Sequence, residues 1–285
     1  LQILSLIGTH SFNLISITIF LVPLLIIFKK NIRYQISLLI FLLTVLICNN
    51  FYGSWKIKKN ETLYRAFEDF KIKIISPKIS IDRFFEANNE HIIIDELIKL
   101  SNPDIFQRTI FIFPEGALAG VNLDTLKNFK KKFSKKFSDK HTIIMGINTE
   151  RMINNSLKTY NSMVILDNRL NLISEYNKIK LVPFGEFLPF EKFFKKIGLK
   201  KISYGYESFS AGNDRNLIFL DDKNFNFIPL ICYEIIYSGK INLKSDKTNF
   251  IINISEDGWF GNSIGPYQHF SHSIFRAIEE GKNII

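Results

Sequence analysis

A long stretch without charge near the start of the chain constrains the fold most strongly. Residues 12–28 carry no charged side chain, and apolar residues extend back to Leu1. A helix that crosses the hydrocarbon core of a bilayer needs about 20 such residues, so this stretch predicts a transmembrane helix. Pro23 lies inside it, and membrane helices tolerate proline. A secretory signal peptide is the competing interpretation.

A second apolar run argues against a signal peptide. It covers residues 36–48 and is extended by the aromatic residues Phe51, Tyr52 and Trp55, which suit a membrane interface. We therefore predict two transmembrane helices, at about 12–28 and 36–52. Basic residues fill the connection between them and also follow the second run. The charge asymmetry favours a cytoplasmic connection and an outer location for everything after Asn60.

Composition leaves several protein classes open and excludes others. The 285 residues are 46% hydrophobic, enough for one large domain with additional elements. The net charge of +10 is compatible with nucleic acid or an anionic membrane, but a nucleotide bias toward Ile, Lys, Asn and Phe explains it equally well. Two cysteines, with Cys48 in an apolar run, do not form a disulfide framework. No zinc-type Cys/His cluster, P-loop or glycine-rich dinucleotide motif is present.

From residue 61 the sequence changes to short apolar runs that alternate with amphipathic segments. The runs predict strands at 71–75, 108–113, 143–146, 163–166, 225–231 and 249–254, and the amphipathic segments predict helices at 90–100 and 123–137. This alternation predicts a layered α/β domain with the sheet inside. The lysines at 130–132, 135 and 136 belong to the solvated face of the second helix, because the phenylalanines occupy core spacing. We expect a membrane region at 1–59 and a second domain at 60–285.

The first candidate site segment follows the strand at 108–113. Glu115 stands in a Pro-Glu-Gly sequence directly after that strand. A carboxylate there is poorly solvated, which suits a general base. An ordinary surface turn has the same composition, and this segment alone favours the turn.

The second segment covers residues 176–187. Lys178 and Lys180 precede a Leu-Val pair, a Pro-Phe-Gly turn and Glu186. An ammonium near a thiol favours the thiolate and binds a developing oxyanion. Lysines also protect exposed strand edges from pairing, which is the alternative.

The third segment is the end of the predicted strand at 225–231. Cys232, Tyr233 and Glu234 follow it at once. Strand ends are rigid and face crevices, so α/β folds place reactive groups there. A buried core thiol is the alternative, and taken alone it is favoured.

Glu, Lys and Cys in this order, each beside an apolar strand, resemble the triad of the nitrilase superfamily. Within it, the chain is more similar to the apolipoprotein N-acyltransferase family of bacterial membrane enzymes. The resemblance rests on residues 181–187, 232–234, 257–261, 265–269 and 276–279. It implies an α/β fold, a nitrilase-like α-β-β-α four-layer sandwich, preceded here by the two transmembrane helices. The chain starts at Leu1 and ends abruptly at Ile285, so we expect a C-terminally incomplete piece of a longer protein.

The resemblance also implies roles for individual residues. Glu115 resembles the general base, Lys178 the triad lysine in preference to Lys180, and Cys232 the nucleophile. The expected substrate-binding residues are Glu186, Tyr233, Glu234 and Trp259. No metal or organic cofactor is expected. The sequence departs from the family at Glu256, where Asn is usual, and at Gly116, where Ser or Thr is common.

The implied reaction is transfer of a fatty acyl group from a phospholipid, through a Cys232 thioester, to the N-terminal amine of a diacylglyceryl-cysteine apolipoprotein. The expected setting is a monomeric, multi-pass protein of the bacterial inner membrane, with its catalytic domain on the periplasmic side and no nucleic-acid partner. Residues 187–201 alternate phenylalanines with lysines, which suits either a lipid-interface segment or an ordinary amphipathic helix. The remaining alternatives are a membrane-tethered amidase that acts on a soluble amide and a non-catalytic binding module.

Overall fold

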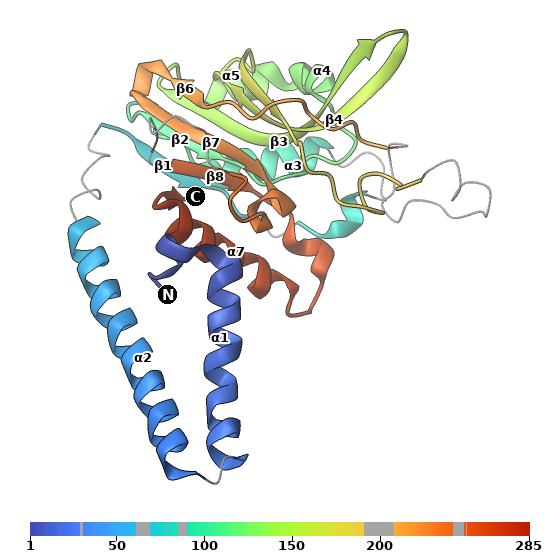
Figure 1. The fold of residues 1–285 in the computed structure, drawn as a ribbon. Helices are drawn as coiled ribbons and strands as arrows, with labels where there is room; N and C mark the ends of the chain where they lie inside the picture. The colour runs from blue at the N-terminus through green and yellow to red at the C-terminus, as the bar shows by residue number, and fades with distance from the viewer. Residues whose placement is uncertain are drawn as a thin grey trace.

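Two long helices extend away from the rest of the chain in a computed structural model that describes residues 1–28, 31–60, 69–77, 79–84, 90–190, 208–241, 248 and 250–285. They are α1 (Leu4–Phe28) and α2 (Ile32–Asn60) (Figure 1). Both predicted helices are present, and both are longer than predicted. Residues 191–207, which include most of the predicted lipid-interface segment, lie outside the described residues.

Length and composition make α1 and α2 candidate membrane spans. The part of α1 after the kink at Gly8, residues 9–28, rises about 30 Å, which matches the roughly 30 Å of a hydrocarbon core. Their side chains point mostly outward, and Phe20 is 82% exposed. Leaving so much apolar surface in water costs about 25 cal/mol per Å², so an apolar environment favours the pair.

The first sheet contains five strands in the order β1-β2-β3-β4-β5. They are β1 (Lys71–Ile74), β2 (Thr109–Ile112), β3 (His141–Ile153), β4 (Ser156–Leu166) and β5 (Leu172–Asn177). β1, β2 and β3 run parallel, whereas β3, β4 and β5 are antiparallel. The predicted strands at 143–146 and 163–166 are the buried parts of a much longer hairpin, whose polar outer half hides it from an apolar pattern.

The second sheet contains four strands in the order β6-β7-β8-β9. They are β6 (Ile218–Leu220), β7 (Phe225–Ile231), β8 (Phe250–Ile254) and β9 (Asn283–Ile284). β7 has the predicted boundaries, and it runs parallel to β8. The two sheets share one apolar core, in which Ile112 and Ile144 of the first sheet pack with Phe227 and Ile252 of the second.

Helices cover the outer faces of both sheets. α3 (Glu90–Ser101), α4 (Leu123–Leu126) and α5 (Lys130–Lys136) pack on the first sheet, and α7 (Gly265–Glu280) lies beside η5 (Cys232–Ile236) and β9 (Figure 1). Short 3₁₀ turns complete the described elements at η2 (Ile81–Phe84), η3 (Lys127–Phe129), η4 (Asp221–Lys223) and η6 (Asp257–Phe260). The order is helix, sheet, sheet, helix, which confirms the expected nitrilase-like sandwich.

The single helix predicted at 123–137 is wrong in one respect. The chain there forms α4, the 3₁₀ turn η3 and α5 in succession. The helix is interrupted at Phe129, whose φ of −93° and ψ of 5° lie outside the α-helical values. This change of winding still keeps Leu126, Phe129, Phe133 and Phe137 buried in the core, so the periodic pattern was correct although the helix is not continuous.

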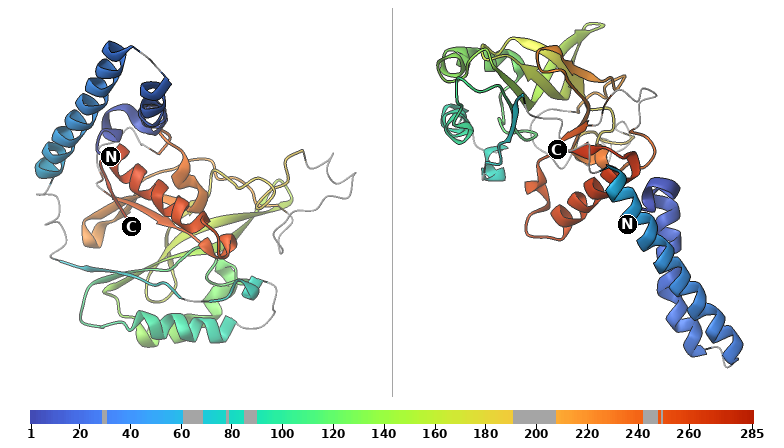
Figure 2. Two further views of the ribbon diagram at one scale, coloured as in Figure 1. Left: turned by 90° about the horizontal axis from the view of Figure 1, so that it is seen from below. Right: turned by 90° about the vertical axis from the view of Figure 1, so that its left-hand side faces the viewer.

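Helix α1 is joined to the sandwich through α7. A left-handed Gly8 (φ 72°) bends α1, and the amide N–H of Thr9 then donates to Glu279 Oε1 at 3.1 Å. Phe12 packs edge-on against Phe275 of α7. Figure 2 shows both long helices leaving the sandwich on the side of α7. The candidate spans are therefore anchored to the helix that also borders the candidate active site.

Candidate active site

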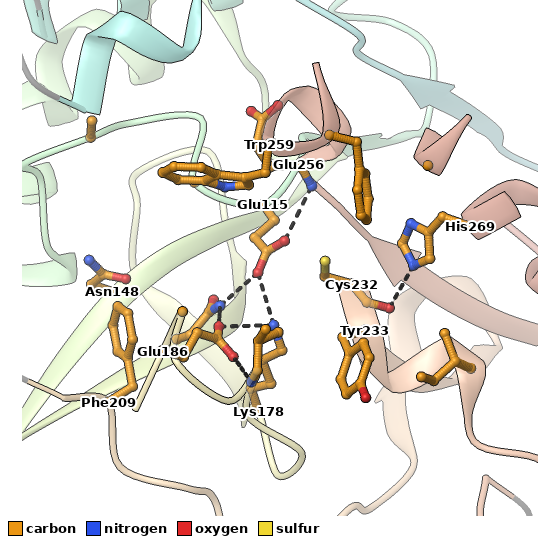
Figure 3. A pocket seen from close by; sticks show the side chains of 18 of the residues that line it. Glu115, Asn148, Lys178, Glu186, Phe209, Cys232, Tyr233, Glu256, Trp259 and His269 are labelled. Atoms are coloured by element: carbon orange, nitrogen blue, oxygen red, sulfur yellow. Dashed lines mark hydrogen bonds and ion pairs between the residues drawn. The ribbon is translucent and has the colours of Figure 1, made fainter. Parts of the chain in front are cut away.

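Three strand ends meet at one side of the two sheets. Glu115 follows β2, Lys178 follows β5 and Cys232 follows β7. All three line one cavity of about 880 Å³. Figure 3 shows the sulfur of Cys232 facing the carboxylate of Glu115, with Lys178 on the other side of that carboxylate. The structure thus brings together three residues that are widely separated in the sequence.

Lys178 is a buried cation between two carboxylates. It is only 1% exposed, and its Nζ lies 2.9 Å from Glu186 Oε1 and 3.3 Å from Glu115 Oε1. Burial acts to lower the pKa of Lys178, but the charges of Glu115 and Glu186 outweigh it and raise the pKa above its ordinary value. The ammonium therefore stays charged. Lys180, the other candidate, is exposed and does not line the cavity.

Besides the thiol of Cys232, Glu115 accepts hydrogen bonds from three donors. The Asn161 amide donates to its Oε1 at 2.6 Å, Lys178 donates to the same oxygen, and the Glu256 backbone N–H donates to Oε2 at 3.2 Å. Asn161 also donates to Glu186 at 2.7 Å, so one amide holds both carboxylates. Sequence reasoning missed Asn161. Asn161 lies in the polar first half of β4, so no apolar pattern marked it.

Cys232 sits where β7 turns into η5, with a left-handed φ of 49°. Burial raises the pKa of its thiol, the charge of Glu115 raises it further, and Lys178 and Ser255 lower it in part, leaving it at about 12. The resting side chain is therefore a thiol. Its proton faces Glu115, a carboxylate placed to remove it.

Four further site residues were predicted to bind substrate. Glu186, Tyr233 and Trp259 line the cavity, and their role in substrate binding stays a prediction. Glu234 does not line it. Its carboxylate is buried, and Oε1 accepts from Arg215 at 2.9 Å and from the backbone N–H groups that follow Lys178.

Glu234 instead ties two parts of the site together. Its Oε2 accepts from the backbone N–H of Ile231, the residue before Cys232, at 3.0 Å. Its Oε1 accepts from the N–H of Ile179, the residue after Lys178, also at 3.0 Å. Tyr176 donates its hydroxyl proton to the same carboxylate. The sequence places Glu234 beside the nucleophile, but the turn in η5 directs its carboxylate away from the cavity. Its predicted contact with substrate therefore has no support from this geometry.

The cavity wall is largely apolar away from its charged side chains, which are Glu115, Lys178, Glu186 and Glu256. Its apolar lining includes Leu118, Ile147, Val182, Phe209, Ile236 and Phe260. Cavities of this kind bind apolar ligands through area and orient them through a few polar groups. Among the described residues, no group of three or more His, Cys, Asp or Glu side chains is arranged to hold a metal ion.

Gly116 and Glu256 are the two positions at which the sequence departs from the family that it resembles, and the structure explains both locally. Gly116 has a left-handed φ of 58°, which a glycine adopts without steric cost. The side chain of Glu256 accepts from the N–H of Gly258 at 2.9 Å and caps η6, while its backbone N–H serves Glu115. The contact with Glu115 therefore depends on the backbone at position 256.

Asp257 and His269 form a second polar cluster next to Cys232. His269 Nδ1 lies 2.8 Å from Asp257 Oδ1, and Nε2 lies 3.1 Å from the carbonyl oxygen of Cys232. Both residues lie in the runs 257–261 and 265–269 that carry the family resemblance, but the sequence predicted no role for either of them.

Comparison with known proteins places this geometry in a family. A model of the carbon-nitrogen hydrolase family matches residues 100–284. Curated relatives named apolipoprotein N-acyltransferase include those of Brucella suis, with 27% identity over 100% of this chain and 54% of the relative, and Wigglesworthia glossinidia brevipalpis, with 33% over 90% and 50%. The protein of Rickettsia typhi has the same name and is 28% identical over 91% and 51%. The chain spans about half the length of these relatives.

Solved structures with a similar arrangement are more distant. An amidase from Nesterenkonia sp. has a TM-score of 0.40 and 11% identity, covering 67% of this chain and 68% of that one. A CN-hydrolase superfamily protein from Xanthomonas campestris has a TM-score of 0.46 and 14% identity, covering 68% of each. The family match covers well over half of the residues and includes the ends of β2, β5 and β7. The chain therefore belongs to the carbon-nitrogen hydrolase family.

Proposed function

We propose that this protein transfers a fatty acyl group from a phospholipid, through a thioester on Cys232, to the amine of an N-terminal diacylglyceryl-cysteine. The observation that carries the proposal is the meeting of Glu115, Lys178 and Cys232 in a large, mostly apolar cavity. The name shared by the matching relatives supports lipoprotein N-acylation as the reaction. The two apolar helices support a membrane as the source of the acyl donor.

The first half-reaction forms the acyl-enzyme. Glu115 takes the proton of the Cys232 thiol, and the sulfur attacks the ester carbonyl of the phospholipid. Of the three N–H donors of Lys178, two point at Glu186 and Glu115, and we assign the third to the oxyanion. The carbon–oxygen bond of the ester then breaks. The departing alkoxide recovers the proton from Glu115 and leaves as a lysophospholipid.

The second half-reaction transfers the acyl group. The amine of the diacylglyceryl-cysteine attacks the thioester carbonyl and loses a proton to Glu115. The carbon–sulfur bond breaks, the thiolate recovers that proton, and an amide is released. The same carboxylate serves in both halves because it contacts the sulfur, the site of bond formation and bond cleavage.

The remaining cavity residues bind and orient. Glu186 keeps the Lys178 ammonium in place, since it accepts both that ammonium and the amide of Asn161. Tyr233 and Trp259 line the cavity and offer aromatic surface to acyl chains. We propose a bacterial inner membrane location, with α1 and α2 as two of its spans and the sandwich on the outer side, where the lipoprotein substrates lie.

Detection of the acyl-enzyme tests the proposal. The protein in membranes is incubated with vesicles of phosphatidylethanolamine carrying deuterated acyl chains, and its peptides are examined by mass spectrometry. We expect a deuterated acyl group on Cys232 that hydroxylamine removes and that Cys232→Ala abolishes. Cys48→Ala is the matched control, because Cys48 lies in α2 away from the cavity, and it should keep the adduct.

The acceptor step follows from the same preparation. A synthetic diacylglyceryl-cysteine peptide should discharge the adduct and gain the deuterated acyl group as an amide, whereas its N-acetylated form should leave the adduct in place. Absence of any adduct, with ammonia released from small amides, would replace this proposal by the amidase alternative.

A further inference from the structure

His269 reaches the backbone of Cys232 from α7. Its Nε2 lies 3.1 Å from the carbonyl oxygen of Cys232, and its Nδ1 lies 2.8 Å from Asp257 Oδ1. The ring is buried, with 8% exposure. Figure 3 shows His269 and the carboxylate of Glu115 on opposite sides of Cys232. The nucleophile is thus contacted from the backbone side by a group that takes no part in the proposed proton transfers.

Both ring nitrogens of His269 face acceptors. A carbonyl oxygen accepts only, and an ionised carboxylate accepts only, so a ring that satisfies both carries a proton on each nitrogen. Ser255 donates its hydroxyl proton to the same oxygen of Asp257 at 2.6 Å, which leaves that oxygen as an acceptor toward His269. Burial acts to lower the pKa of His269, but Asp257, the Cys232 carbonyl and the charge of Glu115 raise it overall.

The backbone of Cys232 needs such support. Its φ of 49° is left-handed, which is costly for any residue with a Cβ. On the N-terminal side, the N–H of Ile231 is fixed by Glu234 at 3.0 Å. On the C-terminal side, the carbonyl of Cys232 is fixed by His269. These two contacts bracket the residue and set the direction in which its Cα–Cβ bond carries the sulfur.

We propose that His269, held by Asp257, is a positioning residue that keeps Cys232 in the left-handed conformation from which its sulfur faces Glu115. This inference rests on the proposed function only in taking Cys232 as the nucleophile. Because α7 also contacts α1, the helix that carries His269 is tied to a candidate membrane span at its other end.

The test measures the rate at which iodoacetamide alkylates Cys232, followed by mass spectrometry of its peptide in the intact protein. Four variants are compared with the wild type: His269→Ala, His269→Gln, His269→Asn and, as a control on the exposed face of α3, His91→Ala. A glutamine amide reaches the position of Nε2 and can still donate to the Cys232 carbonyl. An asparagine amide reaches only the position of Nδ1 and can contact only Asp257.

We expect His269→Ala and His269→Asn to slow alkylation about 10- to 100-fold, as misplacement of a reacting group does. His269→Gln should recover most of that loss, and His91→Ala should react like the wild type. Gln and Asn are both neutral amides that differ by one methylene. A packing defect would lower the urea midpoint together with the rate, whereas loss of the hydrogen bond to the Cys232 carbonyl lowers the rate between variants of equal midpoint. Equal rates for these two variants, or an unchanged rate in His269→Ala, would overturn the proposal.

The outcome is separable from the proposed function. Iodoacetamide needs no lipid, so a protein that forms no acyl adduct but shows the Gln/Asn difference retains the positioning role and loses only the lipid reaction. Conversely, lipid acylation with equal Gln and Asn rates keeps the proposed function and removes the role of His269. Denaturant midpoints of the variants identify any that fail to fold, and the Gln/Asn comparison is made between folded proteins.

Discussion

Removing the Glu234 carboxylate should destabilise the sandwich far more than removing an exposed carboxylate with a similar ion pair. Glu234 is completely buried, and Arg215, its cationic partner at 2.9 Å, is only 10% exposed at the side chain. Asp95 pairs with Lys132 at 2.6 Å on the surface of α3, where the side chains are 63% and 36% exposed. The two ion pairs differ in solvent exposure and in the number of further hydrogen bonds to the carboxylate, so the comparison separates a buried, fully bonded carboxylate from a solvated one.

The magnitude follows from what each substitution leaves behind. Glu234→Ala leaves a nearly buried guanidinium and three backbone N–H groups without their acceptor. Breaking a buried pair from one side costs about 3–5 kcal/mol. Asp95→Ala removes a solvated pair worth about 0.2–1 kcal/mol. Glu234→Gln keeps one carbonyl oxygen but loses the charge, and we expect an intermediate loss of about 1–3 kcal/mol.

Equilibrium unfolding in urea, in detergent micelles, measures these differences. Trp259 belongs to the sandwich and Trp55 to α2, so a Trp55→Phe background lets fluorescence report the sandwich alone. The loss for Glu234→Ala corresponds to about 6–20 °C in Tm. Iodoacetamide alkylation of Cys232 should change in the same variant, because Glu234 joins the segments that carry Lys178 and Cys232. A loss no larger than that of Asp95→Ala would refute the bridging role.

Three other predictions concern the site directly. Glu115→Gln should slow acyl transfer by about 10²–10⁴-fold, yet it should lower the pKa of Cys232, because the charge of Glu115 raises it; the alkylation profile should move to lower pH. The His269–Asp257 pair should stabilise the fold between about pH 4 and 6.5. This stability is lost as the pH rises through the raised pKa of His269 and as it falls through the lowered pKa of Asp257. In Asp257→Asn, the thermal midpoint should therefore vary less with pH across that range. Gly146→Ala should displace Glu115, since the new Cβ would lie 2.5 Å from the Cα of Glu115. We expect slower alkylation of Cys232 and a loss of stability of about 1–3 kcal/mol. An unchanged urea midpoint would contradict this prediction.

Agreement between sequence and structure is closest where a single local pattern decides. β7 has its predicted boundaries because apolar side chains occupy both faces of a strand that is buried on both sides. The buried faces of α3 and of the α4–α5 segment follow their apolar periodicity. β5, β6 and β9 were missed, since β5 mixes apolar and polar residues and the other two are three and two residues long. None of them carries a pattern that is strong enough to detect.

The sequence by itself determined the two apolar helices, the layered α/β class and the two strand ends that bear Glu115 and Cys232. These depend on length, hydrophobicity and periodicity, which are local properties. It did not show that one amide, that of Asn161, holds two carboxylates, or that His269 contacts a residue 37 positions away. It preferred Lys178 to Lys180 only through the family resemblance, and it assigned Glu234 to substrate binding. Only the packing of two sheets against each other decides which side of a turn faces the cavity, because that choice is made by partners far apart in the chain.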